Sequence, residues 1–162
     1  MGDTAGARAA IDMLQQLRDR EAQMHEAYWT EQIDIQRRAA SAWLALVDGR
    51  KTDGLAEMRA AADAEDRTEK SAVTPGPLAP ARELLGDMLL ELNQPAQALK
   101  EFEATLAKEP NRFRALHGAA TAARLAGNRT AAEKYYGQLL KVCERGDKPG
   151  RAELQEARHS TL

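Results

Sequence analysis

The sequence predicts an all-α fold, a solenoid of about three and a half antiparallel helix hairpins. Three observations support this prediction. Apolar residues recur three and four positions apart along nearly the whole chain, which is the spacing of one face of an α-helix. Runs of strand length that alternate apolar and polar residues are absent. Short breaks recur at similar distances, as expected of a repeat protein.

The breaks divide the helical pattern into segments. They are Gly2-Asp3, Gly49-Arg50, Asn93-Gln94 and Gly127-Asn128. Pro95 suits the first turn of a helix, where its missing N–H is tolerated, and Pro110 ends the next helix by disfavouring helical geometry at the residue before it. Asn111 is a candidate N-cap. We therefore expect helices over residues 4–20, 26–47, 53–67, 78–92, 95–108, 112–126, 129–143 and 150–160.

The length of 162 residues indicates one domain. Within it we expect a partial repeat over 3–20, a degenerate repeat over 26–67, a proline-containing connector over 70–77, repeats over 78–110 and 112–144, and a C-terminal capping helix over 149–160. Residues 77–80 also match a P-x-x-P ligand pattern. Because they lead directly into a helix, the connector interpretation is favoured.

Small and large apolar residues follow the breaks at fixed distances. A shift of 34 positions aligns Phe102 with Tyr136 and Gly86 with Ala120, and a shift of 44 aligns Met58 with Phe102. Two antiparallel helices approach closely only where both present small residues, so we expect Gly86 to face Ala98, with the large residue filling the gap toward the next hairpin. The predicted packing residues are Ala42, Gly54, Met58, Leu85, Gly86, Ala98, Phe102, Ala120, Ala132 and Tyr136.

Leu85-Gly86, Ala98, Phe102 and Pro110 resemble the 34-residue unit of the tetratricopeptide repeat (TPR) family. The resemblance is strong over residues 79–144 and weak over about 3–67. The later copy departs from the motif, because Ala119-Ala120 replaces the Leu-Gly pair and Glu144 the proline. The resemblance implies a right-handed α-solenoid. The chain also looks like the C-terminal part of large bacterial repeat proteins.

The sequence opens on a break and a second helix of the repeat pattern. We therefore expect the chain to be a segment of a longer protein. Helix 4–20 can pack on helix 26–47 but leaves an uncovered apolar flank, so we expect self-association into a homo-oligomer through this flank.

In the TPR family, ligands lie in a concave groove lined by the first helix of each hairpin. The resemblance places Trp43, Glu83, Asp87, Leu90, Arg114, His117, Thr121 and Arg124 in this groove. For Trp43, core packing and ligand contact both remain open. One subclass binds C-terminal carboxylates with Lys and Asn at two of these positions. In this chain those positions hold Glu83 and Asp87, then His117 and Thr121. The carboxylate-binding site of that subclass is therefore absent.

Other classes of function find no support in the residues. A net charge of −2 argues against nucleic-acid binding, and no apolar run approaches the roughly 18 residues of a membrane span. The start has no signal peptide. His25, His117 and His159 are far apart and Cys143 is the single cysteine, so we expect no metal site, cofactor or internal disulfide. No catalytic constellation appears, and an enzyme is not expected.

The sequence thus predicts a soluble protein–protein interaction scaffold that binds a peptide or protein segment on its concave face. Arg114 and Arg124 would meet acidic groups of this partner, whose identity the sequence does not give. The alternative is an accessory or assembly segment of a larger repeat protein, without a ligand of its own. The sequence does not give the compartment, which would be cytoplasmic or, if the parent protein is secreted, periplasmic.

Overall fold

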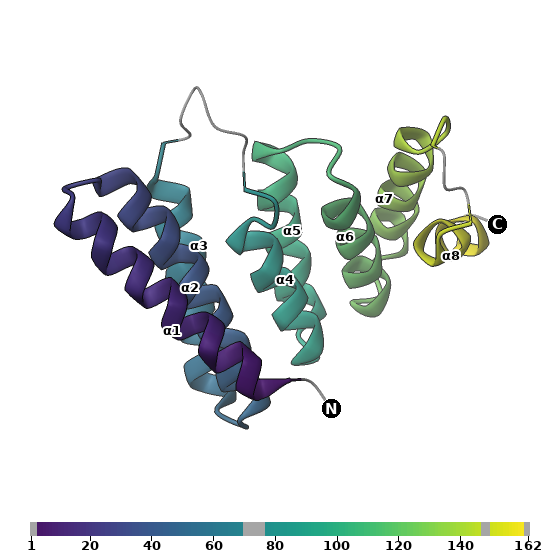
Figure 1. The fold of residues 1–162 in the computed structure, drawn as a ribbon. Coiled ribbons are helices and arrows are strands. Elements are labelled where there is room, and N and C mark those ends of the chain that lie inside the picture. The colour runs from purple at the N-terminus through teal and green to yellow at the C-terminus, as the bar shows by residue number, and fades with distance from the viewer. Residues whose placement is uncertain (1–2, 70–76, 147–149, 161–162) are drawn as a thin grey trace. The chain divides into compact units, whose positions relative to one another are not determined.

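The computed structural model describes residues 3–69, 77–146 and 150–160, which are helical and contain no strand (Figure 1). The helices within these ranges are α1 (Thr4–Gln23), α2 (Ala27–Val47), α3 (Lys51–Arg67), α4 (Ala81–Glu91), α5 (Pro95–Lys108), α6 (Phe113–Leu125), α7 (Arg129–Val142) and α8 (Ala152–Ser160). The predicted all-α class is confirmed. None of these helices is long and apolar enough to cross a membrane.

Helix α4 begins three residues later than expected. Leu78 and Ala79 are not helical, because Pro80 disfavours helical geometry at the residue before it. The backbone N–H of Ala81 donates to Glu65 Oε2 over 2.7 Å, which satisfies one free donor at the helix start. Most of the predicted connector, residues 70–76, lies outside the described residues.

The turns of four helix hairpins share one backbone geometry. His25, Gly49, Asn93 and Gly127 each follow a helix end with a positive φ, between 55° and 82°. At the second turn, the N–H of Gly49 donates to the carbonyl oxygen of Leu46, and the N–H of Arg50 donates to that of Ala45. The other three turns have the same pair of hydrogen bonds. This is the Schellman motif, which satisfies the last carbonyls of a helix.

Two expectations about helix ends differ from the structure. The break between α1 and α2 lies at His25, which the residue type alone did not indicate. Asn111 has a φ of 66° and does not cap α6, since Arg112 is the N-cap residue. Asn tolerates this left-handed conformation better than most residues, and so takes the turn position instead of the cap.

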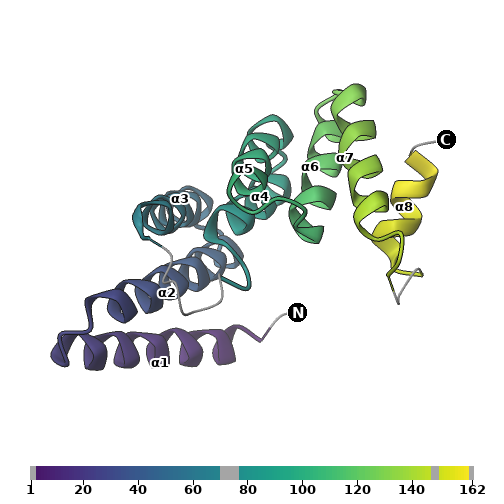
Figure 2. The same cartoon turned by 90° about the horizontal axis from the view of Figure 1, so that it is seen from above.

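The contacts of the chain divide it into two compact units, Met1–Leu85 and Gly86–Leu162, with the boundary inside α4. In the first unit α1 and α3 both pack against α2 (Figure 2). Helices α2 and α3 touch backbone to backbone, because a Cβ on Gly54 would lie 2.7 Å from the carbonyl oxygen of Ala42. Ala42 and Met58 are fully buried at this contact.

In the second unit α6 packs against α5 and α7, and α8 packs against α7. The Phe102 ring, fully buried, lies against Gly86 of α4 and Gly118 of α6. The atoms nearest to a Cβ on Gly86 belong to the Phe102 ring, and Ala98, which we expected Gly86 to face, is fully buried as well. All ten predicted packing residues are buried.

Candidate functional site

A cleft in the second unit lies on the exposed side of α6. Arg114, His117 and Thr121 are spaced three and four residues apart, so they share one face of this helix. The cleft has a volume of about 270 Å³. Its lining residues are Asp87, Leu90, Phe113, Arg114, His117, Gly118, Thr121 and Glu153.

Charged pairs surround an apolar part of this cleft. Arg114 Nη2 lies 2.8 Å from Asp87 Oδ2, and both side chains stay partly exposed. Arg151, just before α8, stacks over the Phe113 ring at 4.3 Å and pairs with Glu153 at 3.0 Å. The cleft therefore offers apolar surface from Leu90 and Phe113 beside charges of both signs.

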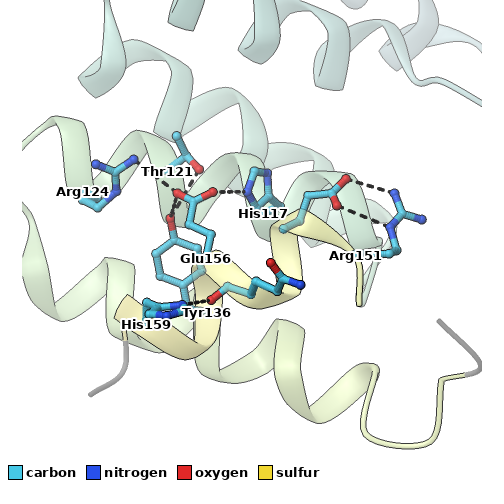
Figure 3. A network of polar contacts seen from close by, with 9 residues as sticks. His117, Thr121, Arg124, Tyr136, Arg151, Glu156 and His159 are labelled. Carbon is cyan, nitrogen blue, oxygen red and sulfur yellow. Dashed lines mark hydrogen bonds and ion pairs between the residues drawn. The ribbon is translucent and has the colours of Figure 1, made fainter. Parts of the chain in front are cut away.

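Next to this cleft, the carboxylate of Glu156 on α8 accepts three hydrogen bonds (Figure 3). The Tyr136 hydroxyl on α7 donates to Oε1 over 2.7 Å, and Arg124 Nη2 on α6 donates to the same oxygen over 3.3 Å. His117 Nε2 on α6 donates to Oε2 over 3.0 Å. Both carboxylate oxygens are thus held by donors from α6 and α7.

Burial and charge act in opposite directions on Glu156. Burial raises the pKa of this carboxyl, but the hydrogen bonds from His117 and Tyr136 and the positive charges of His117 and Arg124 outweigh it and leave the pKa below its ordinary 4.5. The hydrogen bond with Tyr136 and the neighbouring carboxylate raise the pKa of Arg124. The site therefore favours a charged carboxylate.

A second cleft, of about 320 Å³, lies within the first unit beside Trp43. Ile35 and Ala39 of α2 and Leu78 and Ala79 before α4 contribute apolar surface to it. Leu78 is 95 % exposed and forms part of the rim. Trp43 itself is half-buried and lines this cleft.

The structure brings together most of the predicted groove residues. The α6 cleft contains Asp87, Leu90, Arg114, His117 and Thr121. Arg124 joins this set through Glu156. Trp43 lines the separate cleft of the first unit, and Glu83 is fully buried, so its carboxylate is not open to a ligand.

Several residues at the α6 cleft were not predicted. Phe113 and Gly118 lie on α6, and Glu153 and Glu156 lie on α8. The sequence carried one signal for the last of these: Leu154 and Ala157, three apart, mark the buried side of α8, which places Glu156 at its edge. No group of three or more metal-ligating side chains occurs within the described ranges.

The sequence matches no family model, and no curated protein sequence is significantly similar to it. Among solved structures, the chain resembles PcrH from Pseudomonas aeruginosa, with a TM-score of 0.59 and 16 % sequence identity. The match covers 79 % of this chain and 89 % of PcrH. At this identity the likeness shows the fold alone, which is a TPR-like helical repeat.

Proposed function

We propose that the chain is a non-enzymatic scaffold of the TPR type that binds a peptide or protein segment at the α6 cleft. One observation supports this most directly: five residues from α4 and α6 that the repeat pattern assigns to a ligand groove line a single cleft. The cleft, with a volume of about 270 Å³, is smaller than the roughly 300–1,000 Å³ of typical small-molecule sites. It suits one or two side chains of a peptide.

The chemistry of the cleft indicates a mixed ligand segment. Leu90 and Phe113 would receive an apolar side chain, while Arg114 and Asp87 would exchange part of their pairing for polar groups of the ligand. Such exposed ion pairs are worth little on their own, so their rearrangement costs little.

The test begins with peptides selected from a displayed library on the full chain. Arg114→Glu and, separately, Leu90→Glu should weaken binding of the selected peptides at least about tenfold. Arg129→Glu on α7 is the matched control, because this side chain is 89 % exposed outside the cleft. Helix content by circular dichroism should stay constant in all three. Equal binding by the cleft variants and the control would refute the proposed site.

A second candidate function is assembly, in which the chain associates with copies of itself through α1. One observation favours it. Helix α1 has no buried residue, and Met13 and Leu17, four positions apart on one face, are 63 % and 36 % exposed.

A further inference from the structure

The donors around Glu156 form a site for a carboxylate. Tyr136 is fully buried, yet its hydroxyl points to the surface that α8 covers, where it donates to Glu156. Without Glu156, the remaining acceptor for this hydroxyl in the network is Thr121 Oγ1, at 3.5 Å, because the neighbouring Arg124 guanidinium can only donate. A buried hydroxyl without a good partner costs about 1–3 kcal/mol. The surface of α6 and α7 therefore favours a hydrogen-bond acceptor at this position, and the Glu156 carboxylate supplies it.

The helix that supplies this carboxylate is short. Helix α8 (Ala152–Ser160) has only nine residues, and Leu154 and Ala157 are its only buried ones. Helices shorter than about 12–15 residues are marginal in isolation, so α8 depends on its docking. The contacts that dock it on α6 and α7 include these two apolar side chains, the Glu156 carboxylate and the stacking of the adjacent Arg151 on Phe113.

Helix α8 also forms part of the α6 cleft. Glu153 at its start lines the cleft, and His117 belongs to the cleft and to the carboxylate site at once. Departure of α8 would therefore join the α6 cleft and the carboxylate site into one continuous surface on α6. That surface would carry Leu90 and Phe113 at one end and His117, Arg124 and Tyr136 at the other.

We propose that the surface beneath α8 is a docking site for an acidic helix of a partner protein, and that α8 is its displaceable internal occupant. The partner helix carries the pattern of α8: a large apolar residue, a Glu two positions on, and a small residue next to it. Charge complementarity indicates this occupant, because two basic side chains and a tyrosine hydroxyl converge on one carboxylate. Ala157 is fully buried, so we expect a small residue beside the Glu of the partner helix.

This inference rests on the proposed scaffold function and adds that α8 regulates partner binding. While α8 is docked, a partner must compete with a helix of the same chain, whose effective concentration is in the millimolar range. Binding is therefore weak until α8 is released.

The test uses the full chain and a fluorescent peptide of residues 150–160 as the probe for the partner helix. A second form of the chain, the opened chain, carries Leu154→Ser together with Glu156→Gln. These two substitutions release the internal helix. The peptide should bind the opened chain at least about tenfold more tightly than the unmodified chain. Replacing the Glu of the peptide by Gln, or adding Arg124→Glu to the opened chain, should abolish this gain.

Two controls keep the result interpretable. Glu133→Gln removes an exposed carboxylate of α7 that pairs with Arg129 instead of with the donors of Glu156, and it should leave peptide affinity unchanged. If the double variant folds poorly, Glu156→Gln alone serves as a milder opened chain. Its affinity for the peptide should lie between those of the unmodified chain and the double variant. Amide hydrogen exchange of Leu154 and Ala157 in that single variant should be faster than in the unmodified chain.

Three results would overturn the proposal. The first is equal peptide affinity of the opened and unmodified chains, and the second is unchanged exchange protection of α8 in Glu156→Gln. The third is a dimer of the unmodified chain that the peptide dissociates, which would make a second copy the occupant. If library peptides bind both chains equally well and still depend on Arg114, the scaffold function stands and the displacement of α8 is refuted.

Discussion

At the scale of single residues, the packing of the second unit depends on one aromatic ring. Phe102 lies between two glycines, Gly86 on α4 and Gly118 on α6, and has no exposed surface. A glycine in a helix interior costs about 0.5–1 kcal/mol relative to alanine. Both positions accept this cost because a Cβ on either would overlap the ring. The ring replaces the two missing side chains.

We expect Gly118→Ala to destabilise the chain by about 1–3 kcal/mol, because the added methyl group must displace the Phe102 ring. The matched control is Gly137→Ala on α7, where no atom lies within 4 Å of the new Cβ. That change should stabilise by about 0.5–1 kcal/mol through helix propensity alone. Urea unfolding of both variants measures the difference, and equal effects would show that the ring does not need the glycine.

The sequence predicted part of this arrangement. The repeat shift assigned Gly86 and Phe102 to the core, and both are buried. Gly118 was not predicted, because the shift aligns Gly86 with Ala120 instead. Repeat alignment gives equivalent backbone positions, whereas the tilt of an aromatic ring decides which residue of the next helix it touches. This tilt depends on three-dimensional packing and leaves no periodic signal.

At the scale of helices, the turns were predictable where their residue type was specific. Gly49, Asn93 and Gly127 end helices in the left-handed conformation that Gly and Asn tolerate best. His25 takes the same conformation with a φ of 60°, and histidine occurs in many other environments. Glu156 was missed for a similar reason, since one Glu on a short polar helix resembles any solvated residue.

The docking of α8 should weaken in acid. The pKa of Glu156 lies below its ordinary 4.5 in the folded chain, so its contribution is complete above about pH 4.5 and is lost as the pH falls through the lowered value. Arg124 on α6 keeps its positive charge there and loses its charged partner, and the hydrogen bonds from His117 and Tyr136 lose their charged acceptor. Protonation of Glu156 thus weakens each of the contacts that hold its carboxylate.

Amide exchange of Ala157, followed from about pH 6 to about pH 3 and corrected for intrinsic rates, measures this release. The unmodified chain should lose protection of α8 before α6 and α7 do. Glu156→Gln should show weak protection at every pH, whereas Glu133→Gln should follow the unmodified chain. A pH-independent protection of α8 in the unmodified chain would contradict the expected role of Glu156.

At the scale of the whole molecule, the contacts form two compact units, and each contains one cleft that the repeat pattern pointed to. The pattern predicted neighbours correctly because stacked hairpins contact mainly the next hairpin along the chain. It could not show that Glu83, one turn from Asp87, is buried while Asp87 is partly exposed. Side-chain exposure near the end of a groove depends on what packs there, which periodicity does not record.

The exposed apolar face of α1 gives the molecule a second surface on which copies can meet. Met13 is 63 % exposed and Leu17 36 %, and Gly6 and Ala10 continue the same face with side chains small enough for close approach. In sedimentation velocity, we expect the average mass to rise between micromolar and millimolar protein. Met13→Glu with Leu17→Glu should keep the chain monomeric, because association would bury two unpaired charges. Val142→Glu, which places a charge at a 45 % exposed apolar site on α7, should associate like the unmodified chain. A strict monomer at millimolar concentration, or equal loss of association in the Val142→Glu control, would exclude α1 as the interface.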